Sequence, residues 1–328
     1  IAQVNAALGE AIGQLYVARY FPPEHKARMQ TLVANLLAAY RDSITHLTWM
    51  TEATKAQALI KLSKYDTKIG YPDVWRDYSG LDVRVGDALG NQHRAQRFEW
   101  DHQAAKAGHA VDRRDWEMTP QTVNAYYNPM RNEIVFPAAI LQPPLFDMTA
   151  DDARNYGAIG AVIGHEISHG FDNQGSQFDG DGAMRNWWSE ADSKAFAALS
   201  AKLVAQYDAY EALPGRHVDG TLTLPENLAD LAGLQIAYRA WQRSLGSKPA
   251  PTIGGVSGAQ RFFIAYAQSW RAKVRDEQLL QSLTTDPHAP QQFRTNGPLV
   301  NTAGFQQAFA THPGDLMYKA PSERIQIW

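Results

Sequence analysis

Apolar residues recur at helical spacing along most of the first hundred residues, and this pattern predicts a series of helices. The spacing covers residues 6–20, 23–49 and 86–107, and it also predicts a helix that begins after Thr51 or Thr54 as its N-terminal cap. The clearest apolar stripe lies in the second of these helices and is formed by Leu32, Val33, Leu36, Leu37 and Tyr40. The N-terminal third is therefore expected to be helical.

Two interruptions divide this pattern. Gly70-Tyr71-Pro72 breaks the helical spacing, and the polar stretch 108–114 follows the last of the early helices. We therefore predict a helical segment over residues 1–108 and a second domain over residues 109–328.

One clear β signal follows this boundary. Residues 122–127 and 133–136 have the composition of strands, and the turn-rich residues 128–132 separate them. Helical spacing then returns and predicts further helices over residues 150–171, 189–210, 226–245 and 259–274. The predicted fold class is α+β, mostly α-helical, with a small sheet.

The composition narrows the possible functions. Of 328 residues, 45% are hydrophobic and 20% are charged, which is an ordinary balance for a globular protein. The net charge of -3 gives no reason to expect nucleic acid as a partner. No apolar run approaches the roughly 18 residues of a transmembrane helix. The absence of cysteine excludes disulfides, cysteine-ligated zinc and a cysteine nucleophile.

The sequence His165-Glu166-Ile167-Ser168-His169 is the strongest candidate for chemistry. Residues four apart share one face of a helix, so both imidazoles can bind the same ion. Glu166 lies about 100° around the helix from His165, so it cannot share the ligand direction but can reach a water on the ion, as a catalytic base must. The apolar run before the motif predicts a buried helix, where these polar groups are costly without an ion. We predict one Zn²⁺ per chain.

A third ligand distinguishes the subclasses of such sites. Asp172 and Gly175 occupy the positions where one subclass carries its last glycine and a third histidine, which excludes that subclass. Among the glutamates that follow, Glu226 precedes a strongly apolar helix, and Asp230 lies four residues further on the same face, where it could accept the free N–H of a ligand histidine. Glu226 could equally place a negative charge at a helix N-terminus. The residues alone leave both readings open.

Several segments together resemble one known family. They are Leu47-Thr48-Trp49-Met50, Val123-Asn124-Ala125-Tyr126-Tyr127, Ile134-Val135-Phe136-Pro137-Ala138, Ile140-Leu141-Gln142-Pro143-Pro144, the stretch from Val162 to Asp172, Glu226-Asn227-Leu228-Ala229-Asp230, and Asp286-Pro287-His288-Ala289-Pro290 with Phe293-Arg294. In this order they resemble the neprilysin family of zinc endopeptidases, which includes the endothelin-converting enzymes. The resemblance covers essentially the whole chain.

The resemblance implies a fold and a set of roles. It implies a thermolysin-like zincin catalytic domain, preceded by part of a helical lid domain. It implies that Glu226 is the third zinc ligand and that Asp230 is the partner of a ligand histidine. It further implies that Asn124 and Ala125, on an edge strand, bind the substrate backbone, which agrees with the way an exposed strand pairs with a peptide. The remaining implied roles are oxyanion stabilisation by His288, carbonyl binding by Arg294, and an apolar pocket lined by Val162 and Trp270.

The chain also departs from the family pattern. The eukaryotic members are rich in cysteine, whereas this chain has none, and this points to a bacterial relative. Leu231-Ala232-Gly233 replaces the usual Asn/Asp-Gly-Gly, and Leu145 stands where an aromatic residue is common. Family members are about twice as long, so the chain is expected to be the C-terminal half, with a missing N-terminal half of the same protein as a candidate partner.

The function expected from these observations is zinc-dependent hydrolysis of internal peptide bonds before bulky apolar residues, with Glu166 as the base. Its substrates are peptides, and family habit implies an extracytoplasmic location, periplasmic or secreted. One alternative is a truncated zinc- or peptide-binding fragment without activity. Another is an aminopeptidase of the same zinc subclass, although the chain lacks the Gly-x-Met-Glu-Asn element of such enzymes.

Overall fold

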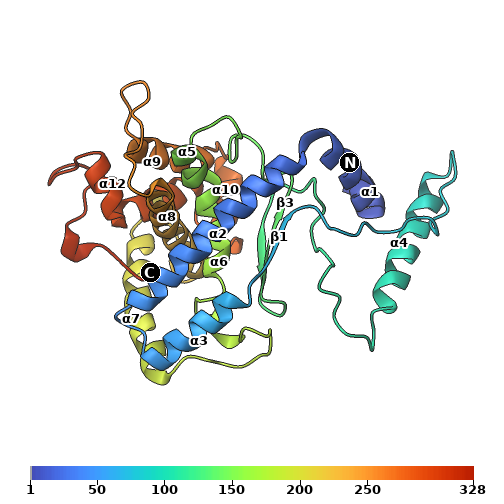
Figure 1. Ribbon diagram of the computed structural model, residues 1–328, viewed down its shortest axis with the longest axis horizontal. Coiled ribbons are helices and arrows are strands. Elements are labelled where there is room, and N and C mark those ends of the chain that lie inside the picture. The colour runs from blue at the N-terminus through green and yellow to red at the C-terminus, as the bar shows by residue number, and fades with distance from the viewer. Residues whose placement is uncertain (1) are drawn as a thin grey trace. The chain divides into compact units, whose positions relative to one another are not determined.

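The computed structural model describes residues 2–328, which form two compact units (Figure 1). Unit 1 comprises the described residues up to Met29 together with Thr67–Ala125 and Val135–Leu141. Unit 2 comprises Gln30–Asp66, Tyr126–Ile134 and Gln142–Trp328. The domain boundary predicted at residue 108 stays a prediction, since these units reflect compactness alone.

Unit 1 contains two whole helices, α1 (Ala2–Tyr20) and α4 (Ala88–Ala104). Three elements begin in one unit and end in the other: α2 (Pro23–His46), β1 (Asp66–Gly70) and β3 (Glu133–Pro137). Gly70 ends β1 at a positive φ of 84°, and a Cβ there would lie 2.3 Å from the ring of Phe21. Only glycine fits both conditions, which explains the break in the helical pattern at this point.

Unit 2 contains the remaining elements. Its helices are α3 (Glu52–Ser63), α5 (Asp152–Asn155), the π-helical turn η1 (Tyr156–Gly160), α6 (Ala161–Ser168), the 3₁₀ turn η2 (Gly175–Gln177), α7 (Glu190–Asp208), α8 (Leu224–Leu245), α9 (Gly258–Ser269), α10 (Asp276–Thr285), α11 (Gln291–Asn301), α12 (Ala303–Ala308) and the 3₁₀ turn η3 (Pro321–Glu323). Its strands are β2 (Tyr126–Asn128), β4 (Glu211–Leu213) and β5 (Arg216–His217).

The strands form two small sheets. The first has the order β1-β3-β2, and the second is the antiparallel pair β4-β5. The prediction of a mostly helical α+β fold with a small sheet is therefore confirmed. No helix within residues 2–328 is long and apolar enough to cross a membrane.

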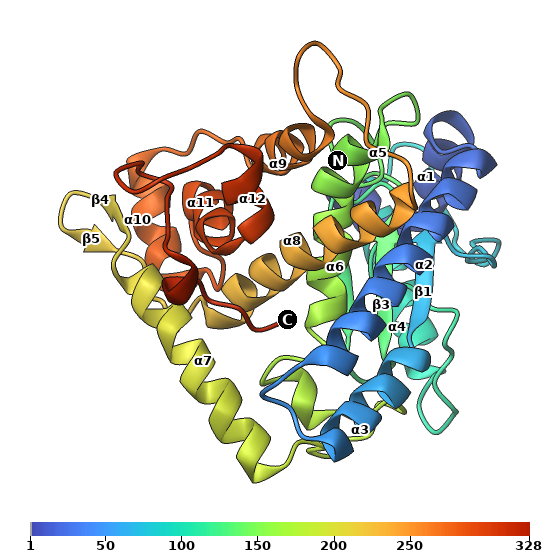
Figure 2. The same ribbon diagram turned by 60° about the vertical axis from the view of Figure 1, so that its left-hand side comes forward.

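The core of unit 2 is built on the contact between α6 and α8, which lie side by side in Figure 2. Gly164 and Gly233 face each other at this contact, and a Cβ on Gly233 would lie 2.5 Å from Ala161 O and 2.6 Å from His165 N. The two backbones approach this closely because neither residue carries a side chain. Both helices are largely buried, so they form a rigid support for the polar residues they carry.

Some predicted elements differ from the observed ones. The single helix predicted over residues 150–171 is divided into α5, η1 and α6. The strand predicted over residues 122–127 is wrong in its first half, since β2 begins only at Tyr126. Locally, Thr122 N donates to Thr119 O at 3.0 Å and Ala125 N donates to Asn124 Oδ1 at 2.9 Å, and such turn contacts replace strand pairing.

Candidate metal centre

The helix α6 presents the two histidines of the His-Glu-x-x-His motif, with His169 as its C-terminal cap residue. The π-helical turn η1 directly precedes this helix, and such turns are frequent at functional sites. The buried Tyr40 and the half-buried Tyr65 contact the backbone of α6: Tyr40 Oη donates to Gly164 O at 2.7 Å and Tyr65 Oη donates to Ile167 O at 2.8 Å. These bonds tie the backbone of the short helix to two tyrosines that lie far from it in the sequence.

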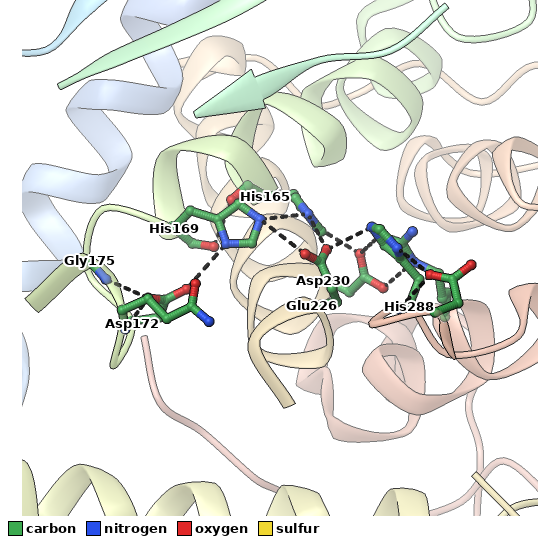
Figure 3. A network of polar contacts seen from close by, with 11 residues as sticks. His165, His169, Asp172, Gly175, Glu226, Asp230 and His288 are labelled. Carbon is green, nitrogen blue, oxygen red and sulfur yellow. Dashed lines mark hydrogen bonds and ion pairs between the residues drawn. The ribbon is translucent and has the colours of Figure 1, made fainter. Parts of the chain in front are cut away.

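Three side chains converge at one point between α6 and α8 (Figure 3). His165 Nε2 lies 3.0 Å from His169 Nε2 and 3.0 Å from Glu226 Oε2, and His169 Nε2 lies 3.8 Å from Glu226 Oε1. Within the described part of the chain, this is the one group of three or more acidic or histidine side chains compact enough to hold a metal ion.

The hydrogen bonds at the far side of each imidazole determine which nitrogen faces this point. His165 Nδ1 lies 2.8 Å from Asp230 Oδ1, and His169 Nδ1 lies 3.2 Å from Asp172 Oδ2. Because an ionised carboxylate only accepts, each Nδ1 must carry the proton, and each neutral imidazole then directs the lone pair of Nε2 toward Glu226.

This donor set fits a zinc ion. With bonds of about 2.0–2.1 Å, ligand atoms in a tetrahedral site stand about 3.4 Å apart, close to the separations above. The buried Glu226 Oε2 lies 3.0 and 3.1 Å from nitrogens of His165 and His288, yet it makes no hydrogen bond to the described residues. A buried carboxylate oxygen without a hydrogen bond is costly unless a cation satisfies it.

The electrostatics of the site favour positive charge. Burial lowers the pKa of His165, but Asp230 and Glu226 outweigh burial and raise this pKa to about 10. Burial raises the pKa of Glu226, but His165 and His288 outweigh it and hold this pKa well below its usual range. A site that attracts protons this strongly also attracts a metal cation, and the two compete for the same atoms.

Glu166 lies beside the ligand group without belonging to it. Glu166 is buried, and its negative charge raises the pKa of both His165 and His169. Across residues 2–328 no side-chain hydrogen bond or ion pair engages this carboxylate. An ionisable group near a metal centre with no structural partner has the properties that a general base needs.

His288 and Arg294, both from the C-terminal part of the chain, complete the polar network. His288 Nε2 lies 3.1 Å from Glu226 Oε2, while its Nδ1 lies 2.8 Å from Asp286 Oδ1. Arg294 on α11 donates from Nε and Nη2 to the two oxygens of Asp230, each at 2.7 Å. Asp230 therefore links His165 to this arginine.

The remaining predicted site residues lie beside Arg294, on α6 and in the loop before β2. Trp270 stacks beneath Arg294, whose guanidinium carbon is 4.0 Å from the centroid of the indole. Val162 lies on α6 one turn before His165 and is partly exposed, whereas its neighbours are buried. Asn124 is exposed and Ala125 is buried in the loop before β2; both belong to unit 1, whereas the other site residues belong to unit 2.

Sequence reasoning missed the role of Asp172. Its Oδ2 faces His169, and its Oδ1 accepts hydrogen bonds from Gln174 N and Gly175 N, each at 2.8 Å (Figure 3). The sequence carried a signal, since Asp172 lies three residues after His169 and is therefore close to it at the end of a helix.

The chain is similar to proteins of one peptidase family. The family model described as peptidase family M13 matches residues 124–325, and an N-terminal model of the same family matches residues 1–72. Neprilysin-3 of Drosophila melanogaster is 34% identical over the whole chain, which spans 43% of that protein. Endothelin-converting enzyme 1 of Homo sapiens is 37% identical over the whole chain, and the match covers 44% of the length of that enzyme.

A solved structure is also similar. The crystal structure of the zinc metalloprotease ZMP1 of Mycobacterium tuberculosis in complex with an inhibitor superposes with a TM-score of 0.94 at 50% identity, over 99% of this chain and 50% of that one. The chain thus spans about half the length of the relatives it matches. Because the N-terminal model is itself matched in part, these matches give no support to the expected separate N-terminal half. They do establish the resemblance seen in the sequence, and this chain belongs to peptidase family M13.

Proposed function

We propose that this chain carries the catalytic centre of a zinc endopeptidase that hydrolyses internal bonds of peptides. One observation carries the proposal: His165, His169 and Glu226 offer ligand atoms within 4.8 Å of one another, and Glu166 lies beside them without a structural partner. Membership of peptidase family M13 supports both the metal and the reaction class. The three side chains would hold one Zn²⁺.

When bound, zinc supplies Lewis-acid chemistry at the scissile carbonyl. Glu166 takes a proton from the attacking water, whose oxygen forms a bond to the carbonyl carbon. As the carbon–nitrogen bond breaks, Glu166 passes this proton to the departing amine. Glu166 is 8% exposed and makes no competing side-chain hydrogen bond to the described residues, which supports this assignment.

His288 and Arg294 are proposed to stabilise the negative charge that develops on the carbonyl oxygen. The ion pair with Glu226 raises the pKa of His288, which favours an imidazolium that donates from both nitrogens. Asp230 engages Nε and Nη2 of Arg294, and Nη1 makes no hydrogen bond to the described residues. We assign this remaining N–H group to a substrate carbonyl.

Substrate recognition is proposed from the family resemblance. Asn124 and Ala125 would pair with the backbone of an extended peptide, and the exposure of Asn124 supports this role. Val162 and Trp270 would line a pocket for a bulky apolar residue after the cleaved bond. An extracytoplasmic location is proposed on the same basis.

A second candidate function is a metal- or peptide-binding module without activity of its own. The length of the chain favours it, since the relatives named above are about twice as long. The partnerless Glu166 favours catalysis, because metal binding alone does not need this side chain.

The test measures zinc content and cleavage of a quenched fluorescent peptide for the wild type and for Glu166→Gln. We expect one zinc per chain in both proteins and loss of cleavage in the variant by at least a factor of about 100, the lower range for a general base. Glu190→Gln, at an exposed glutamate of α7, is the matched control and should retain activity. Bound zinc without cleavage in the wild type would support the binding module, and no bound zinc would refute the proposal.

A further inference from the structure

The most unusual group outside this mechanism is a buried lysine on α3. Lys61 is 1% exposed, and its ammonium donates to Gly175 O and Phe178 O, each at 2.7 Å. The rings of Tyr127, Phe171 and Trp187 surround it at 5.7–6.0 Å from their centroids. A buried charge is costly, so this position needs a reason beyond packing.

The two carbonyls that Lys61 binds belong to the segment that follows the ligand His169. Gly175 accepts from Lys61 at its carbonyl, while its N–H donates to Asp172 Oδ1 at 2.8 Å. The other oxygen of Asp172 faces His169 Nδ1 at 3.2 Å (Figure 3). A continuous path of hydrogen bonds therefore runs from Lys61 through Gly175 and Asp172 to a ligand imidazole.

The charges along this path are complementary. Asp172 is 3% exposed and faces an imidazole that must stay neutral to bind a metal. Burial lowers the pKa of Lys61 to about 7, while the carboxylates of Asp172 and Asp179 act in the opposite direction. The ammonium is thus a nearby positive charge for the buried Asp172.

We infer that Lys61 is a positioning residue for the metal centre, which holds the segment 172–178 so that Asp172 directs His169 Nε2 toward His165 and Glu226. The inference rests on the proposed function to the extent that these three residues bind a metal. A second connection supports it: Asn132 Nδ2 donates to Lys61 O at 3.1 Å and to Gly180 O at 3.2 Å, so Asn132 links α3 to the residues that directly follow this segment.

The test compares metal affinity in the wild type, Lys61→Met and Asp172→Asn. Methionine keeps the length of the side chain but removes its charge and its donors. We expect Zn²⁺ affinity, measured by competition with a chelator, to fall about 10–100-fold in each variant, as for other residues that orient a metal ligand. The visible spectrum of the Co²⁺-substituted protein should change in both. The double variant should lose less than the product of the two single effects, because both act on one path.

The matched control is Lys64→Met, one turn further along the chain after α3. Lys64 is exposed and pairs with Asp181 at 2.7 Å, so it binds the same loop region without reaching Gly175 or Phe178. Its Zn²⁺ affinity and Co²⁺ spectrum should match the wild type.

The possible outcomes separate the two proposals. If the wild type binds no zinc, the proposed function fails first. If the wild type binds zinc and folded Lys61→Met binds it within twofold of the same affinity and with an unchanged Co²⁺ spectrum, Lys61 is only structural and the inference is wrong. If Lys61→Met does not fold, Lys61→Gln, which keeps an amide donor, is measured by the same criteria. Unchanged Zn²⁺ binding by Asp172→Asn would also contradict the proposed path of hydrogen bonds.

Discussion

Each histidine of the candidate ligand set is held at Nδ1 by a buried aspartate that also binds a second group. Asp230 faces His165 and receives two hydrogen bonds from Arg294, whereas Asp172 faces His169 and receives two backbone N–H groups. The first arrangement joins three helices, α6, α8 and α11, and the second closes a loop. Because each aspartate fixes both the tautomer and the direction of an imidazole, changing either should affect metal binding more than local packing.

We predict that Asp230→Asn weakens Zn²⁺ binding about 10–100-fold, because the amide accepts a hydrogen bond from His165 less strongly than a carboxylate does. The metal-free variant should also lose about 3–5 kcal/mol of unfolding free energy, since Arg294 stays buried without a charged partner. Chelator competition and urea unfolding measure the two effects. Asp276→Asn, at an exposed aspartate of α10, is the control. Unchanged zinc affinity in Asp230→Asn would contradict the role assigned to it.

The buried ammonium of Lys61 predicts a pH dependence of stability. Its pKa in the folded state is about 7, below the value of about 10.4 in an unfolded chain, so the unfolded state binds more protons between these values. Stability from this group therefore rises with pH from about 7 to about 10 and is lost as pH falls through 7. In metal-free protein, the unfolding free energy of the wild type relative to Lys61→Met should rise across this window. Lys202→Met, at an exposed lysine of α7, is the control; a difference that stays flat with pH would contradict the prediction.

How far the site could be predicted from the sequence depends on where each residue lies. His165, Glu166 and His169 share one helix, and Asp230 follows Glu226 by four residues on another, so regular geometry fixes their directions. Asp172 lies beyond the end of α6, where the direction of a side chain depends on loop contacts that no periodicity encodes. His288 likewise lies outside regular elements, between α10 and α11, where the contact of its ring with Asp286 follows from no periodicity.

At the scale of elements, the metal centre depends on the close contact of α6 with α8. One helix carries the two histidines and the other carries Glu226 and Asp230, so the distance between the helices sets the distance between ligand atoms. Gly164 and Gly233 allow this distance. The sequence differs from the usual family pattern at Leu231 and Ala232, but it keeps Gly233, which makes the contact with α6.

We predict that Gly233→Ala destabilises the protein by about 1–3 kcal/mol, as overpacking of a core does. The new Cβ would meet the backbone of Ala161 and His165, which cannot move without shifting a ligand, so Zn²⁺ affinity should also fall. Thermal unfolding and chelator competition measure these effects. Gly160→Ala is the matched control, because its Cβ has ordinary contacts at 3.5 Å and should be neutral or stabilising by up to about 1 kcal/mol. If both substitutions change stability and Zn²⁺ affinity by the same amount, close packing at Gly233 does not determine the geometry of the site.

The early helices could be predicted because apolar stripes mark them, but α10, α11 and α12 were not predicted. In α11 the sequence Gly297-Pro298 reads as a turn, and proline inside a helix normally ends it. The structure nevertheless keeps the helix, and Gly297 packs against the ring of Tyr207, which leaves no room for a side chain there. Tertiary packing overrides local preference in this helix, which is also the one that carries Arg294.

At the scale of the whole molecule, all candidate zinc ligands belong to unit 2, although they lie 61 residues apart between His165 and Glu226. The C-terminus lies in the same unit, where Trp328 is 3% exposed and packs against Tyr40 and Phe171. Phe171 follows the second histidine by two residues. The aromatic core therefore joins the C-terminal residues to the helix that presents the ligands.

Zinc should stabilise the fold because it binds only the state in which α6 and α8 are in contact. At free zinc about 100 times the dissociation constant, the gain is about 2.7 kcal/mol, which for a unit of this size corresponds to a rise in Tm of about 5–11 °C. Calorimetry of the zinc-loaded and chelated protein measures this rise. Because every ligand lies in unit 2, only the transition of that unit should shift if the two units unfold separately. Glu226→Gln removes a charged ligand while keeping its size, and it should bind zinc more weakly and lose most of the shift. A rise in Tm as large in Glu226→Gln as in the wild type would mean that zinc binds elsewhere, whereas its loss would tie the stability of the whole unit to the three residues between α6 and α8.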